Sequence, residues 1–200
     1  MNILIIGANG TIGQKVTAKL AEKHTIITAG RNGADETVDI ADATAIKDLF
    51  ERIPAQDAVV CIAGEAKWDY FKNLTEEDFY VGVRSKMMGQ VNLVRIGKDY
   101  LKPNASFTLS TGVLADDPVV MTTSAAMVNG AIHSFVKAAA LEMENGQRIN
   151  VVCSGLVEDS KEKYEDYFPG HDPVPMPKVV NAYVKSIMGK NNGEIIRVNA

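Results

Sequence analysis

Three glycines near the start of the chain have the spacing of a turn that binds phosphate. Gly7, Gly10 and Gly13 follow an apolar run, residues 2–6, and precede an amphipathic stretch. In such a strand–turn–helix unit the first glycine permits a tight turn, the second lets backbone approach a diphosphate, and the third allows close helix packing. The first helical amides then face the anion. The spacing predicts a dinucleotide site, with a simple tight turn as the alternative.

The elements that must position this turn alternate along the chain. Apolar runs rich in Val and Ile predict seven strands, and 3.6-residue periodicity predicts helices between them. The predicted strands are residues 2–6, 25–29, 36–39, 58–63, 106–110, 149–153 and 194–199. The predicted helices are residues 12–23, 43–52, 82–99, 122–145 and 178–188. This pattern is typical of a doubly wound α/β domain of Rossmann type. We expect one domain over residues 1–200, with about seven mainly parallel strands and helices on both faces.

Composition narrows the class of partner. The formal net charge is -4, and the basic residues are scattered, which argues against nucleic acid or an anionic membrane surface. A small-molecule substrate is expected instead. Cys61 and Cys153 lie inside apolar runs, where we expect free thiols. No apolar run approaches the roughly 18 residues of a membrane span, and no leader segment is evident, so a cytoplasmic location is expected.

Several strand ends resemble motifs of the short-chain dehydrogenase/reductase family. Residues 62–64, Ile-Ala-Gly, are similar to the family's Asn-Ala-Gly, and residues 109–112, Leu-Ser-Thr-Gly, resemble its serine-bearing strand. Residues 149–155, Ile-Asn-Val-Val-Cys-Ser-Gly, resemble the family segment Asn-Val-Val-Ser-Pro-Gly. The Gly-x-x-Gly-x-x-Gly spacing is that of the extended and atypical branches. The resemblance implies an NAD(P)-binding oxidoreductase fold.

The second predicted strand suggests which dinucleotide is bound. Arg31 follows it, and a planar guanidinium suits a 2′-phosphate, so NADPH is the expected cofactor; a solvated arginine in a turn is the alternative. Asp39 and Ile40 resemble the family pair that meets the adenine, although Asp39 could equally cap a helix. The predicted cofactor-binding residues are Gly7, Asn9, Gly10, Thr11, Ile12, Gly13, Arg31, Asp39, Ile40, Ala63, Gly64 and Gly155.

The resemblance breaks down at the catalytic positions. The family's tyrosine and the lysine one helical turn later correspond to Ala125 and Asn129, and Lys86 stands where the family has asparagine. This exchange of lysine and asparagine resembles ketoreductase domains of polyketide synthases, which nevertheless retain tyrosine. The predicted catalytic residues are Thr111, Lys86 and Asn129. A solvated Lys86 and a Thr111 hydroxyl satisfied by backbone are the alternatives. With three histidines and no cluster of ligands, no metal site is expected, and His133 is interpreted as structural or surface.

Two functions follow from these residues. The first is NADPH-dependent reduction of a small carbonyl compound, with Lys86 or an ordered water as proton donor and Thr111 and Asn129 orienting the oxygen. The second is a non-catalytic NAD(P)H-binding sensor or partner protein of the same fold, suggested by Ala125.

Residues 158–177, with four prolines and several aromatic residues, predict a helix-containing substrate lid. The helices at 82–99 and 122–145 are expected to pair subunits in a homodimer or homotetramer.

Overall fold

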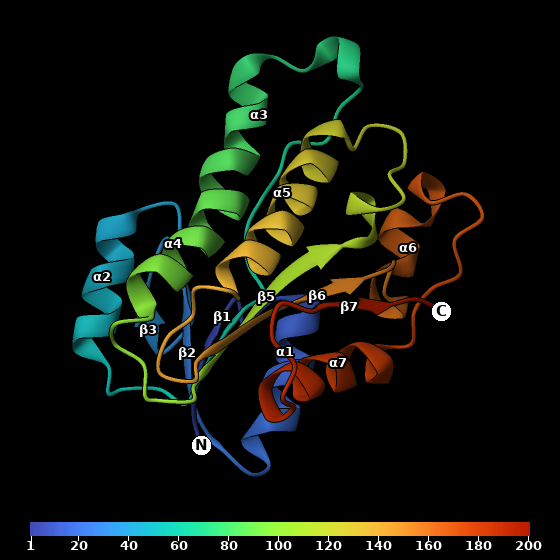
Figure 1. Cartoon of the computed structure of the whole chain (residues 1–200). Coiled ribbons are helices and arrows are strands. Elements are labelled where there is room, and N and C mark those ends of the chain that lie inside the picture. The colour runs from blue at the N-terminus through green and yellow to red at the C-terminus, as the bar shows by residue number, and fades with distance from the viewer.

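The computed structural model describes residues 1–200 and contains one seven-stranded sheet (Figure 1). All neighbouring strands are parallel, in the order β3-β2-β1-β4-β5-β6-β7. The strands are β1 (Asn2–Ile6), β2 (Thr25–Gly30), β3 (Glu36–Thr37), β4 (Ala58–Cys61), β5 (Ser106–Gly112), β6 (Arg148–Ser154) and β7 (Ile195–Val198). Successive strands β1 to β3 are added toward one edge of the sheet and β4 to β7 toward the other, so the strand order reverses between β1 and β4. Ligands of open α/β sheets bind at the carboxyl ends of the strands beside such a reversal.

Helices cover both faces of the sheet, as the sequence predicts (Figure 1). One face carries α1 (Thr11–Ala21) and α7 (Met176–Met188), and the other carries α2 (Ala43–Arg52), α4 (Gly89–Gly97) and α5 (Thr123–Ala139). Alternate residues of β1 serve the two layers because side chains of a strand point to opposite faces. Ile3 and Ile5 belong to the apolar cluster under α1 and α7, and Leu4 and Ile6 to the cluster under the other helices.

The predicted start of the long helix at residue 82 is wrong. Helix α3 (Glu76–Gly82) begins six residues earlier, where Thr75 and Asp78 form a reciprocal capping box. It continues through a π-helical segment, η2 (Val83–Met88), directly into α4. The π-helical turn interrupts the 3.6-residue periodicity, which is why the pattern indicated only the later part.

The predicted end of the next long helix, at residue 145, is also wrong. Helix α5 ends at Ala139, and Asn145 and Gly146 then form a turn with φ of 53° and 71°. Both residue types adopt positive φ readily, so this pair forms the turn that follows the non-helical residues 140–144. The turn leads directly into β6.

Residues 158–177 form the predicted helix-containing segment beside the carboxyl ends of the strands. It contains η4 (Glu158–Ser160), α6 (Lys161–Tyr164) and η5 (Glu165–Tyr167). A bridge between Val157 and Val174 joins its two ends, and α7 begins at Met176, slightly before the predicted position.

No helix of the chain has both the length and the apolar character needed to cross a membrane. Both cysteines are buried and free.

Candidate active site

The glycine turn between β1 and α1 is built by close backbone packing. Gly7 has φ of 86°, and a Cβ atom there would lie 2.5 Å from the Ile62 carbonyl oxygen. A Cβ atom on Gly13 would lie 2.1 Å from the Gly7 carbonyl oxygen. Gly10 differs, because a Cβ atom would meet only that same oxygen at 3.5 Å, an ordinary contact. The protein itself therefore requires glycine at the first and third positions, while the exposed second position leaves its backbone open to a ligand.

A cavity of about 260 Å³ extends from this turn to the ends of β2 and β4. Most of the predicted cofactor-binding residues line it, namely Gly7, Asn9, Gly10, Arg31, Asp39, Ile40, Ala63 and Gly64. Four do not. Ile12 and Gly155 line a neighbouring cavity, Gly13 is buried beneath the turn, and Thr11 is exposed at the start of α1.

The loop after β2 is tied to the glycine turn by a side chain. The Asn9 amide donates hydrogen bonds to the carbonyl oxygens of Asn32 and Gly33, at 3.1 and 2.8 Å. Asp39 accepts a hydrogen bond from the Ala41 amide, whereas the side chain that caps α2 is that of Asp42. The alternative interpretation of Asp39 as the cap of that helix is therefore wrong. Its side chain belongs to the wall of the cavity.

Arg31 forms an ion pair that the sequence did not indicate. Its guanidinium donates to the carboxylate of Glu65, which follows Gly64 at the end of β4. Both side chains are more than half exposed, at 61% and 56%. Arg31 is thus exposed but paired, and any anion that approaches it also approaches Glu65. The only signal in the sequence was an acidic residue directly after the Ile-Ala-Gly motif.

A second cavity, of about 390 Å³, brings the predicted catalytic residues together. Lys86, Thr111 and Asn129 all line it, as does Ala125 on the same face of α5 as Asn129. Gly64 lines both cavities, so they meet at the end of β4. The remaining wall is largely apolar and includes Ala66, Trp68, Leu114, Leu156 and Phe168.

Lys86 reaches this cavity from the π-helical segment. A Cβ atom on Gly64, whose φ is 119°, would lie 2.7 Å from the Lys86 Cα, so the missing side chain lets the segment approach the strand end. The Lys86 side chain is partly buried, and its ammonium forms no ion pair or hydrogen bond within the protein. Burial lowers its pKa from the usual 10.5. Burial also raises the pKa of the neighbouring Cys61 thiol to about 11, which keeps that thiol neutral.

Thr111 is joined to a buried histidine. Its hydroxyl and the Nε2 atom of His133 share a hydrogen bond of 2.8 Å. The alternative, a hydroxyl satisfied by backbone, is not observed. Behind the ring, the Nδ1 atom lies 4.0 Å from Asp116, whose carboxylate accepts two hydrogen bonds from Arg197, at 2.7 and 3.0 Å. Thr111, His133 and Arg197 come from β5, α5 and β7, and Asp116 lies in a turn after β5, so no local pattern in the sequence links them.

Asn129 offers an unused hydrogen-bonding group. Its side chain is only 3% exposed, and its Oδ1 atom has no partner within the protein. A buried amide oxygen without a partner is costly, and a ligand hydroxyl in the cavity would satisfy it. Together with the open backbone at Gly10, this orphan oxygen fits a dinucleotide that spans the two cavities.

Aromatic residues line the second cavity on the side of segment 158–177. The ring of Trp68 lies 5.8 Å from that of Tyr164, 6.0 Å from Tyr167 and 6.3 Å from Phe168, measured between centroids. Tyr164 and Phe168 line the cavity, whereas Tyr167 is 41% exposed. The cluster gives the segment 158–177 an apolar attachment to the loop after β4.

The chain is similar to a protein-family model and to several solved structures. A family model described as enoyl-(acyl carrier protein) reductase matches residues 2–172. The protein lin1944 from Listeria innocua, whose crystal structure is known, is 45% identical to this chain in sequence. The two structures have a TM-score of 0.97, with 99% of each chain covered. A small-chain dehydrogenase in complex with NADPH is 25% identical, with a TM-score of 0.87 over 100% of this chain and 96% of that one.

A more distant structure shows how general the fold is. The aldohexose dehydrogenase of Thermoplasma acidophilum is 14% identical, with a TM-score of 0.87 over 98% of this chain and 91% of that one; at this identity the likeness concerns the fold alone. No curated protein sequence matches the chain. The family model covers most of the chain, and the sheet order, the glycine turn and the strand-end cavities agree with it. The chain therefore belongs to the short-chain dehydrogenase/reductase family, a family of oxidoreductases that bind NAD(P).

Proposed function

We propose that this protein is an NADPH-dependent reductase of a small carbonyl compound. The observation that carries the proposal is the meeting of two cavities at Gly64: one contains the open glycine turn, and the other contains Lys86, Thr111 and Asn129. A dinucleotide that extends from the first cavity to the second would present its nicotinamide beside these three polar side chains. The similar dehydrogenase structure with bound NADPH supports this choice of cofactor.

Several residues would hold the dinucleotide. The turn at Gly10 offers its backbone to the diphosphate, and Asp39 and Ile40 line the part of the cavity that suits the adenine. Arg31 is the one cation in this cavity and would pair with a 2′-phosphate. Asn129 would accept a hydrogen bond from a hydroxyl group at the other end.

The second cavity suits carbonyl reduction. Bound NADPH would supply a hydride to the carbonyl carbon. As negative charge develops on the carbonyl oxygen, the Lys86 ammonium stabilises it, and partial burial strengthens this interaction because little water competes. Thr111 and Asn129, which line the same cavity, orient the oxygen. The apolar wall around Trp68 and Phe168 favours a substrate with an apolar group.

Two substitutions test these roles. We expect Lys86→Ala and Thr111→Val each to lower kcat for carbonyl reduction by about 10²-fold, the usual loss when one polar group that stabilises the transition state is removed. Thr111→Val is nearly isosteric and should leave the Kd for NADPH unchanged. Turnover is measured by oxidation of NADPH and the Kd by an equilibrium titration. Turnover that neither substitution alters would reject both role assignments.

One observation favours a second candidate, a non-catalytic NAD(P)H-binding protein. Ala125 occupies the place on α5 where the family's tyrosine is expected, and it is 4% exposed in the cavity wall. A cavity without that phenol retains the shape for a dinucleotide but lacks the family's proton donor. Tight binding of NADPH without turnover on a broad panel of carbonyl compounds would support this candidate.

A further inference from the structure

His133 is not part of the lining of the second cavity, but its ring is hydrogen-bonded to Thr111, which is. It is 6% exposed, and its Nε2 atom shares the 2.8 Å hydrogen bond with Thr111, whose side chain lines the cavity. On the other side of the ring, the Nδ1 atom faces the Asp116 carboxylate at 4.0 Å. A hydroxyl, an imidazole and a carboxylate therefore follow one another outward from the cavity. This is the order in which a carboxylate orients an imidazole toward a reactive hydroxyl.

We propose that Thr111 and His133 form a proton relay that protonates the carbonyl oxygen, in place of the missing tyrosine. The proposal rests on the reductase function proposed above and assigns the proton to His133 rather than to Lys86 or water. Thr111 is the catalytic residue in contact with substrate. His133 is a positioning and relay residue that acts through it.

The relay balances protons and electrons. With the reduced dinucleotide bound, a C–H bond of its nicotinamide would break and a C–H bond would form at the carbonyl carbon. The π electrons of the C=O bond would move to oxygen, and the oxidised dinucleotide would remain. That oxygen takes the Thr111 hydroxyl proton, and the Thr111 oxygen takes the Nε2 proton of the His133 imidazolium. The alcohol product and a neutral ring with hydrogen on Nδ1 remain. After the product leaves, a solvent proton returns to Nε2 through Thr111.

The Asp116 carboxylate favours the protonated ring. It is held by Arg197 from β7 and is 38% exposed, beside a third cavity of about 390 Å³ that both residues line. At 4.0 Å it is too far for a direct hydrogen bond, but it attracts the Nδ1–H group electrostatically. This attraction also selects the ring orientation in which Nε2 faces Thr111.

The charged and titratable groups around His133 set the pH dependence. Burial lowers its pKa from 6.5, Asp116 raises it, and Arg197 and Lys137 lower it further, with a net decrease. Cys153 lies on β6 beside Thr111 of β5, and its thiol stays neutral because burial raises its pKa. The imidazolium is therefore the minor form at neutral pH. Reduction should slow as pH rises through the His133 pKa, because the proton-loaded ring is then lost.

The first test removes the titrating ring while keeping a hydrogen-bond donor. Glutamine can still donate to Thr111, so His133→Gln should fold and bind NADPH with unchanged Kd. We expect kcat to fall by about 10²-fold, the lower end of the contribution of general acid catalysis. The decline of kcat across the His133 titration should also disappear. A purely structural histidine would not alter the pH profile.

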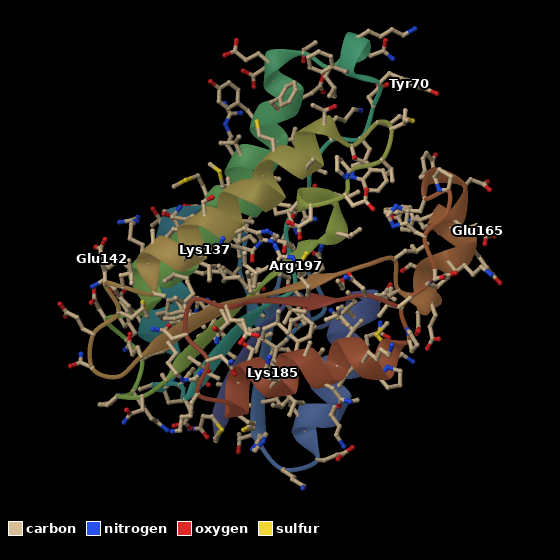
Figure 2. All side chains as sticks on the ribbon, turned by 45° about the vertical axis from the view of Figure 1, so that its right-hand side comes forward. Tyr70, Lys137, Glu142, Glu165, Lys185 and Arg197 are labelled. Carbon is tan, nitrogen blue, oxygen red and sulfur yellow. The ribbon has the colours of Figure 1, made fainter.

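The second test measures His133 directly, without catalysis. The ring ¹⁵N resonances of the full-length protein, assigned by their absence in His133→Gln, report its pKa. Lys137→Gln should raise that pKa and move the kcat profile to higher pH, because a nearby cation is removed. Lys185→Gln is the matched control: Lys137 extends from the α5 layer and Lys185 from the α7 layer on the opposite face of the sheet (Figure 2). Lys185→Gln should alter neither the His133 pKa nor the pH profile of kcat.

The outcomes separate the relay from the proposed function. Turnover by wild-type protein with a pH profile that His133→Gln leaves unchanged would overturn the relay alone. A pKa shift in Lys137→Gln without a matching shift of the kcat profile would do the same. NADPH binding with no turnover in wild-type protein would overturn the reductase function and, with it, the relay.

Discussion

At the scale of single residues, the pairing of Arg31 with Glu65 has the clearest consequence for the choice of cofactor. The guanidinium suits a 2′-phosphate, but the carboxylate beside it repels the same group. Glu65 is therefore expected to limit the preference for NADPH over NADH. This effect would not follow from Arg31 alone, and the position of Glu65 directly after the Ile-Ala-Gly motif does not by itself predict the pairing.

Two substitutions test this arrangement. Arg31→Ala should weaken NADPH binding by about tenfold or more, the equivalent of one charge-assisted hydrogen bond, and should leave NADH binding nearly unchanged. Glu65→Gln should tighten NADPH binding selectively, because it removes a negative charge near the phosphate. Equilibrium titrations with both reduced cofactors measure these changes. Equal affinities for NADPH and NADH that Arg31→Ala does not alter would reject a 2′-phosphate site here.

At the scale of elements, the π-helical segment η2 positions Lys86 because Gly64 lets it approach β4. Gly64→Ala would introduce a Cβ atom 2.7 Å from the Lys86 Cα at a backbone φ of 119°. We expect it to lower both the melting temperature and turnover. Gly130→Ala is the matched control, because Gly130 lies within α5 and a Cβ atom added there would meet nothing within 4 Å. It should stabilise the chain by up to about 1 kcal/mol through helix propensity. A melting temperature of Gly64→Ala equal to or higher than that of the wild-type protein would contradict this role of Gly64.

The same elements show what the sequence could and could not predict. The unit of β1, glycine turn and α1 was predictable because its strand pattern, glycine spacing and helix are contiguous. The beginning of α3 was missed because η2 breaks the helical periodicity. The contact between Thr111 and His133 was missed because it joins β5 to α5, and Asp116 and Arg197 are 81 positions apart. Such contacts depend on how the elements pack, which no local pattern records.

At the scale of the whole molecule, exposed apolar side chains on α3, η2 and α5 support the expected homo-oligomer. They are Tyr80, Val81, Met88 and Met127, each 37–45% exposed. Pairing of these helices with a second subunit would remove this surface from water. Light scattering should give a mass of two or four times 21.6 kDa. Met127→Glu should shift the mass toward one subunit. A wild-type mass of one subunit would contradict the expectation.

At the same scale, the two cavities share Gly64, and aromatic residues of segment 158–177 line the second one. We propose that this continuity joins cofactor binding to carbonyl reduction. The most direct test is to incubate the wild-type protein with NADPH and a panel of small aldehydes and ketones, and to follow the absorbance of the reduced nicotinamide together with the alcohol product. We predict that NADPH is consumed with formation of an equal amount of alcohol for at least one carbonyl compound with an apolar group. NADPH that binds tightly but is not oxidised by any member of the panel would contradict the reductase function.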